Sequence, residues 1–170
     1  MTETSDEESI TKELHAWFGL SAYYVQCFEV ELVTLHILLT RIDNRSMKKG
    51  QLDDCEDILS AETLGKLLKR LGQKASVSTE FQTLFDTYLS KRNYLMHHFF
   101  FHNSDKLGST EGLILMTEEL KELAYLFKEA NSVAMEMSKN VRQRLGISEK
   151  DVEQEIAEYV EQTKNKYRPK

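Results

Sequence analysis

The chain has 170 residues, enough for one domain with an ordinary hydrophobic core. Its formal net charge of −6 argues against a general DNA-coating role, which needs a basic face, and its two cysteines are too few for a disulfide framework. One proline and seven glycines, in a chain rich in Leu, Glu and Lys, predict an all-α protein with few tight turns.

Residues 1–9 are acidic and polar, unlike the start of a secretory signal, and are predicted to form a flexible tail. The apolar-rich run over residues 14–42 is interrupted by Glu29, Glu31 and His36, so it is not expected to span a membrane. We therefore expect a cytoplasmic protein.

A single helical domain is predicted over residues 10–167, and it begins with one long helix at about residues 10–45. The apolar stripe of this helix consists of Trp17, Leu20, Tyr24, Phe28, Leu35, Leu38 and Ile42. Glu31 falls in the centre of that stripe. The back of the helix is also apolar, which predicts a second cover, and in so small a domain we expect another subunit to supply it.

Residues 46–60 are predicted to be a polar connection. The acidic run at 53–57 favours a solvated surface over a metal site, because aspartates without a glycine turn do not match a calcium loop. A short helix is predicted over residues 62–71, with Gly72 as its C-terminal stop.

The central helix is predicted over residues 80–102, where apolar residues recur at steps of three and four. They include Leu84, Phe85, Tyr88, Leu89, Leu95, Met96 and Phe99. Arg92 falls near the centre of this stripe, with Asn93 and His97 at its rim. A buried cation costs several kcal/mol unless it is paired, so we expect Arg92 to pair with Glu31.

After the central helix, residues 112–116 are predicted to be an extended segment or the approach to another helix. Thr117 is the expected N-cap of that helix, and Gly146 is its expected stop. Ser148 with Asp151 predicts the start of a final helix. These elements together predict an antiparallel bundle of about five helices.

In the segment Arg92-Asn93-Tyr94-Leu95-Met96-His97, an arginine is followed directly by a polar residue and, shortly afterwards, by a histidine. At this point the chain resembles the HEPN family (higher eukaryotes and prokaryotes nucleotide-binding domains). These are small helical bundles whose signature is an arginine and a histidine separated by four to six residues, the first of which is polar. The resemblance covers most of the chain in architecture, and Arg92, Asn93 and His97 in motif.

The resemblance implies a metal-independent endoribonuclease that acts as a homodimer without a cofactor, with the motifs of both subunits in one cleft. Attack by a 2′-hydroxyl needs groups that take and give protons, which suits histidine, and a cation on the phosphate oxygens, which suits a guanidinium. His97 is therefore the expected acid/base, Arg92 the phosphate clamp and Asn93 a positioning hydrogen-bonder.

The expected supporting residues are Glu31, Tyr94 inside the motif, and His98 next to its histidine. RNA is the expected substrate. The resemblance also implies a toxin or phage-defence effector with an antitoxin or regulatory protein as partner. Some family toxins carry a tyrosine two residues after the histidine that a partner nucleotidyltransferase modifies. Here that position is Phe99, which argues against an antitoxin of that type.

Two other functions stay open at this point. In the first, the chain is a non-catalytic dimeric interaction module, and Arg92 is a buried structural charge paired with Glu31. In the second, the chain is a helical regulator that binds a nucleotide or nucleic acid without cleaving it. His98 and His102, four residues apart, could share a metal ion, but no third ligand lies near them in the sequence.

Overall fold

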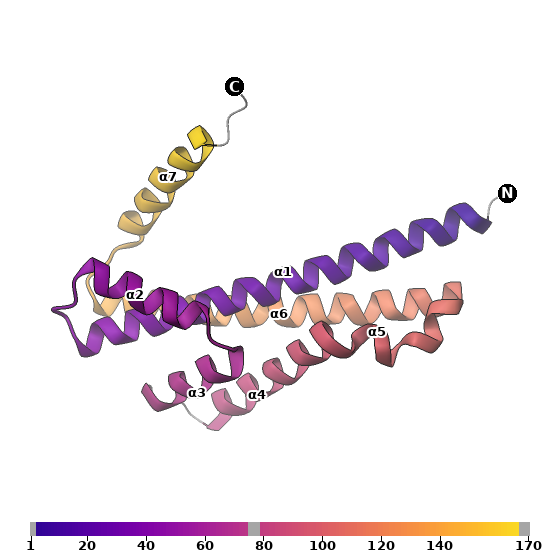
Figure 1. The fold of residues 1–170 in the computed structure, drawn as a ribbon, viewed down its shortest axis with the longest axis horizontal. Coiled ribbons are helices and arrows are strands. Elements are labelled where there is room, and N and C mark those ends of the chain that lie inside the picture. Colours follow the sequence, from indigo (N-terminus) through magenta and orange to yellow (C-terminus); the bar gives the residue numbers. More distant parts are fainter. Residues whose placement is uncertain (1–2, 75–78, 167–170) are drawn as a thin grey trace.

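The computed structural model describes residues 3–74 and 79–166, and within these ranges the chain is all-α without a strand (Figure 1). Residues 1–2 of the predicted tail and residue 167, the predicted end of the domain, lie outside the described residues. The elements in chain order are α1 Glu3–Asp43, α2 Lys49–Ser60, α3 Leu64–Lys74, α4 Thr79–Asn93, a π-helical turn η1 Tyr94–His98, α5 Phe99–His102, a 3₁₀ turn η2 Ser104–Gly108, α6 Thr110–Arg144 and α7 Glu149–Lys166.

The two longest helices, α1 and α6, lie side by side and run in the same direction (Figure 1). Near their starts, the Ser21 hydroxyl donates to the Leu120 carbonyl at 3.0 Å, and Glu13 pairs with Lys121 at 3.2 Å. Towards their ends, Leu35 shares a core cluster with Ala134. The predicted antiparallel arrangement is therefore wrong for this pair.

Helix α4 runs against both long helices. Its Tyr88 ring lies 5.6 Å from Phe28 of α1, whereas Phe99, beyond its end, lies 6.2 Å from Phe18, nearer the start of α1. The sequence order of these contacts is reversed between the two helices, as an antiparallel pair requires. Thus α1, α4 and α6 form the body of the molecule, with α4 as the one reversed member.

Other segments of the same chain cover the back of α1, where we expected a second subunit. Val33 packs with Leu59 of α2 and Leu67 of α3 in a small cluster, while Phe18 contacts Phe99 and Phe100. The apolar back of α1 is therefore explained within the chain.

Helix boundaries differ from the predictions in several places. Helix α1 already begins at Glu3, residues 49–60 are helical, and Gly72 lies inside α3. Helix α6 begins at Thr110, where Ser109 is the N-cap and its side chain accepts a hydrogen bond from the Gly112 amide at 3.1 Å.

Two predicted helix boundaries agree with the structure. Gly146 ends α6 with φ of +75°, a left-handed conformation that glycine adopts without steric cost. At the start of α7, the Asp151 carboxylate accepts from the Ser148 hydroxyl at 2.6 Å, and the Asp151 amide donates back to that hydroxyl at 3.2 Å. None of the described helices combines the length and apolar character needed to cross a lipid bilayer.

Candidate functional site

The π-helical turn η1 brings Arg92 and His97 together. In an α-helix, residues five apart point about 140° away from each other. In a π-helix the hydrogen bonds run between residues five apart, so such residues stack on consecutive turns. The observed result is a separation of 3.3 Å between Arg92 Nη1 and His97 Nε2, and of 3.2 Å between Arg92 Nη1 and Asn93 Oδ1. The three motif residues therefore form one cluster.

The contact with Arg92 selects which tautomer of a neutral His97 ring fits this geometry. A guanidinium N–H can only donate a hydrogen bond, so His97 Nε2 must accept and the ring proton lies on Nδ1. The lone pair of a neutral His97 ring therefore faces the Arg92 guanidinium, and a substrate proton can reach it once the guanidinium moves to the phosphate. The neutral ring is the form in which an imidazole can take a proton from a substrate.

Glu29 of α1, and not Glu31, holds Arg92. Arg92 Nε donates to Glu29 Oε1 at 3.1 Å, so the predicted pair with Glu31 is wrong. Residues two apart on a helix point about 200° apart, so only one of these two carboxylates can face α4. Glu29 follows Phe28, which packs against α4, whereas Glu31 Oε1 is buried without a hydrogen-bond partner among the described residues.

The cluster lies at the surface rather than in the core. The Arg92 side chain is 25% exposed and that of Glu29 is 29% exposed, while Asn93 and His97 are exposed. Arg92 therefore lies at the rim of the apolar stripe, where its stem is covered and its head group reaches solvent. A ligand can reach both the guanidinium and the imidazole.

Tyr94 points away from this cluster and closes the other side of the turn. Its hydroxyl donates to Glu119 at 2.7 Å and accepts from the Asn103 amide at 3.0 Å, and Asn103 also donates to the Phe99 carbonyl at 2.9 Å. Burial, and then the hydrogen bond to Glu119, raise the pKa of Tyr94 above its ordinary value. Tyr94 thus joins η1 to α6, and the hydrogen bonds of its hydroxyl go to Glu119 and Asn103 rather than to Arg92, Asn93 or His97.

His98 lies beside the cluster, with its ring centroid 6.3 Å from that of His97. Its ring stacks on that of His102, with centroids 5.6 Å apart and planes within 17°. Among the described residues no group of three or more His, Cys, Asp or Glu side chains is placed to hold a metal ion. On the exposed side of the turn, Met96 and Phe101 face solvent, and Phe101 is 78% exposed. Met96, expected in the apolar stripe, is rotated out by the π turn.

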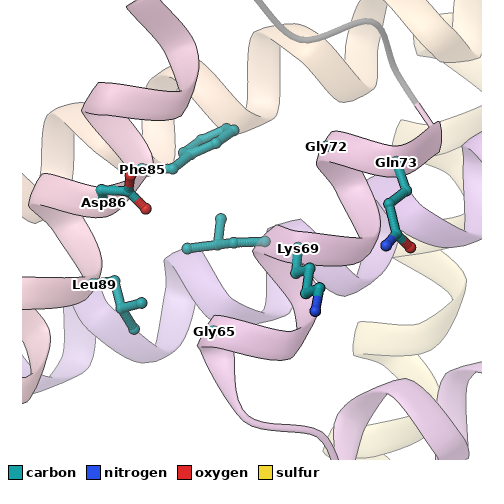
Figure 2. Close-up of a pocket in the computed structure, with 8 residues that line it drawn as sticks. Gly65, Lys69, Gly72, Gln73, Phe85, Asp86 and Leu89 are labelled. Atoms are coloured by element: carbon teal, nitrogen blue, oxygen red, sulfur yellow. The ribbon is translucent and has the colours of Figure 1, made fainter. Parts of the chain in front are cut away.

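Two surface hollows of about 330 Å³ each flank the body of the molecule. One borders Glu29 and is lined by α1 and the turn between α2 and α3, with Gln26, Ser60 and Glu62 among its polar groups. The other lies between α3 and α4, where Gly65 and Gly72 leave space beside Phe85 and Leu89 (Figure 2). The first hollow adjoins the Arg92 cluster through Glu29.

Glu29 is the one member of the cluster that the motif does not contain. A sequence signal for it existed, because Glu29 is a charged residue on the otherwise apolar back of the first helix. Because the sequence predicts a subunit contact on that back, it does not predict the pairing of Glu29 with Arg92. Comparison of the chain with protein-family models, with curated proteins and with solved structures found no match.

Proposed function

We propose that the chain is a metal-independent endoribonuclease of HEPN type that acts as a dimer in the cytoplasm. The observation that supports this most directly is the 3.3 Å contact between Arg92 Nη1 and His97 Nε2 on an exposed π turn. It places a proton acceptor next to a phosphate-binding cation, the pair of groups that cleavage by a 2′-hydroxyl requires.

Each residue of the cluster has a part in the proposed reaction. When the substrate binds, Arg92 Nη1 moves from His97 Nε2 to the phosphate, and the freed Nε2 takes the proton of the attacking 2′-hydroxyl. The 2′-oxygen then attacks the adjacent phosphorus and expels the 5′-oxygen. Arg92 binds the phosphate oxygens, on which negative charge grows. Its hydrogen bonds to described residues use Nε and Nη1, which leaves Nη2 for the phosphate. Glu29 and Asn93 hold the guanidinium in place, and the hollow beside Glu29 offers room for a neighbouring nucleotide.

The leaving 5′-oxygen needs a proton that neutral His97 cannot supply at the same moment. In the proposed dimer, His97 of the second copy supplies it and must therefore start the reaction as the protonated imidazolium. The exposed apolar side chains of Met96 and Phe101 beside the cluster support a contact between copies at this face.

The test is cleavage of a total RNA preparation in the presence of a chelator. Wild type should cleave RNA to products with 2′,3′-cyclic phosphate ends. His97→Ala and Arg92→Ala should each lose about 100-fold or more in rate. His102→Ala, which alters an exposed histidine on the same segment, is the matched control and should keep the wild-type rate. Absence of cleavage of any RNA by wild type would overturn the proposal.

Mixing wild type with His97→Ala tests the dimer. If each cleft needs both copies of His97, activity should follow the square of the wild-type fraction once subunits have exchanged. A linear dependence would show that each subunit cleaves alone. As a toxin or phage-defence effector, the wild-type chain should arrest growth when expressed without its antitoxin, and His97→Ala should not.

A second function is favoured by one specific observation, the ion pair between Glu29 and Arg92 that joins α1 to α4. In this alternative the chain is a non-catalytic dimeric interaction module with Arg92 as a structural charge. It predicts no RNA cleavage and a large loss of stability in Arg92→Ala. RNA binding without cleavage would instead favour the regulator.

A further inference from the structure

Helix α7 projects from the body of the molecule (Figure 1). It carries an apolar stripe that the described part of the chain leaves exposed. Ile156 is 57% and Tyr159 68% exposed, and Val160 is also exposed. An ion pair between Lys139 and Glu149 ties its first turn to α6. A helix in water gains most of its stability by packing an apolar face, so this stripe needs a partner.

The spacing of the stripe is that of a coiled-coil seam. Val152, Ile156, Tyr159 and Thr163 follow each other at intervals of four, three and four residues. Tyr159, Val160, Thr163 and Lys164 enclose a surface hollow of about 260 Å³ on the helix itself. The seam therefore has both protruding side chains and a hole that a side chain of another helix can fill.

We propose that α7 pairs with α7 of a second copy of this chain in the antiparallel direction, around a two-fold axis between Ala157 and Glu158. Ile156 then lies opposite Tyr159 of the other copy, and Val152 lies opposite Thr163. Both pairs are centred on the same point between Ala157 and Glu158. A single register therefore brings every residue of the stripe opposite another residue of the stripe. In this register Val152 of one copy fills the hollow beside Thr163 of the other.

The charges of α7 select this direction. Residues 149–158 contain five acidic residues and one lysine, whereas residues 159–166 contain one acidic residue and two lysines. Glu153 and Lys164 are eleven residues apart, about three turns, so they lie on the same flank of the stripe. Antiparallel pairing places Lys164 between Glu149 and Glu153 of the other copy, whereas parallel pairing sets the two acidic halves side by side.

The inference does not depend on the nuclease, and solution mass tests it. Ile156→Asp should at least halve the mass of the wild-type assembly in analytical ultracentrifugation. Ile114→Asp is the matched control, because Ile114 is 46% exposed and lies at the far end of α6. It should leave the mass unchanged. A monomeric wild type, or an unchanged mass in Ile156→Asp, would overturn the proposal.

Disulfide trapping tests the direction independently of folding effects in that variant. In a background with Cys27 and Cys55 replaced by serine, Val152→Cys and Thr163→Cys should cross-link when mixed, and neither should cross-link alone. Two copies of Val152 lie about 16 Å apart along the paired helices, beyond the reach of a disulfide. Cross-linking of Val152→Cys with itself, or none in the mixture, would overturn the antiparallel pair.

A charge reversal tests the flank contacts. Lys164→Glu should raise the dissociation constant of the pair about three- to tenfold at low salt. Lys150→Glu makes the same change in net charge on the side of α7 opposite the stripe and should leave the constant unchanged. Equal effects of the two substitutions would contradict the register.

Discussion

The guanidinium of Arg92 forms hydrogen bonds with a carboxylate, an amide and an imidazole, and these contacts lie at the surface. Ion pairs with solvent access gain about 0–1 kcal/mol, because water competes for both charges and salt screens them. The Glu29–Arg92 pair has more than a fifth of each side chain exposed. Its main effect is therefore orientation of the guanidinium rather than stability of the fold.

The first prediction follows from that exposure. Arg92→Ala should lower the free energy of unfolding by about 1 kcal/mol or less, as measured by urea denaturation. Arg70→Ala, which breaks another ion pair with solvent access, that with Glu62, is the control and should cost a similar amount. A loss of about 3 kcal/mol or more at Arg92 would instead indicate a structural charge that the fold requires.

Tyr94 predicts a pH dependence of stability. Its folded-state pKa is raised, chiefly by burial, so the unfolded chain loses this proton first as the pH rises. Its contribution is complete below its ordinary pKa of about 10 and is lost as the pH rises through the raised value. Unfolding free energies of wild type and Tyr94→Phe between pH 8 and 11 should therefore converge. A gap that widens with pH would contradict the prediction.

At the scale of the elements, the junction between η2 and α6 leaves no room for a side chain at Gly112. A Cβ there would lie 2.0 Å from the Lys106 carbonyl oxygen, whereas a Cβ at Gly19, inside α1, meets nothing within 4 Å. Two glycines in helices thus have opposite roles. Gly112 permits a close backbone approach, and Gly19 only weakens its helix.

Alanine at these two positions should have effects of opposite sign. Gly112→Ala should cost about 1–3 kcal/mol, because the backbone of η2 must move away. Gly19→Ala should gain about 0.5–1 kcal/mol, since alanine is the better helix former. Urea denaturation of both variants measures the difference. Equal effects of the two substitutions would mean that the backbone of η2 moves away from residue 112 without loss of stability.

The sequence predicted helical structure well where amphipathic periodicity is strong, as in α1, α4 and most of α6. It also predicted that Arg92, Asn93 and His97 belong together. It did not predict the π turn, because the apolar spacing around Leu95 and Phe99 fits a continuous α-helix nearly as well. Without that turn, the helical wheel places Arg92 in the core and Met96 in the stripe.

The partner of Arg92 was missed for a related reason. The second cover of the first helix was expected from another subunit, but α1 is covered on two sides by its own chain, by α6 and by α2 to α5. Glu29 and Glu31 thus face different neighbours, and a pattern read along one helix cannot say which neighbour each face meets. The packing of whole helices against one another determines which carboxylate binds Arg92. It also determines the parallel direction of α1 and α6.

For the molecule as a whole, the body and α7 should respond differently when α7 loses its proposed partner. In Ile156→Asp, the amides of α7 should exchange with solvent markedly faster than in wild type, because an isolated helix is only marginally stable. The amides of α1 and α6 should keep their protection. Hydrogen exchange followed by mass spectrometry measures both. Unchanged exchange in α7 would mean that its helix needs no partner.

The side-by-side course of α1 and α6 has a consequence for synthesis of the chain. Ser21 meets Leu120, which lies 99 positions later, so the principal neighbour of the first helix leaves the ribosome long after it. At translation rates of about 5–20 residues per second, the apolar surface of α1 stays exposed for roughly 5–20 s before α6 is synthesised. During that interval the nascent chain is a natural client for chaperones, and slow codons before α6 would prolong its exposure.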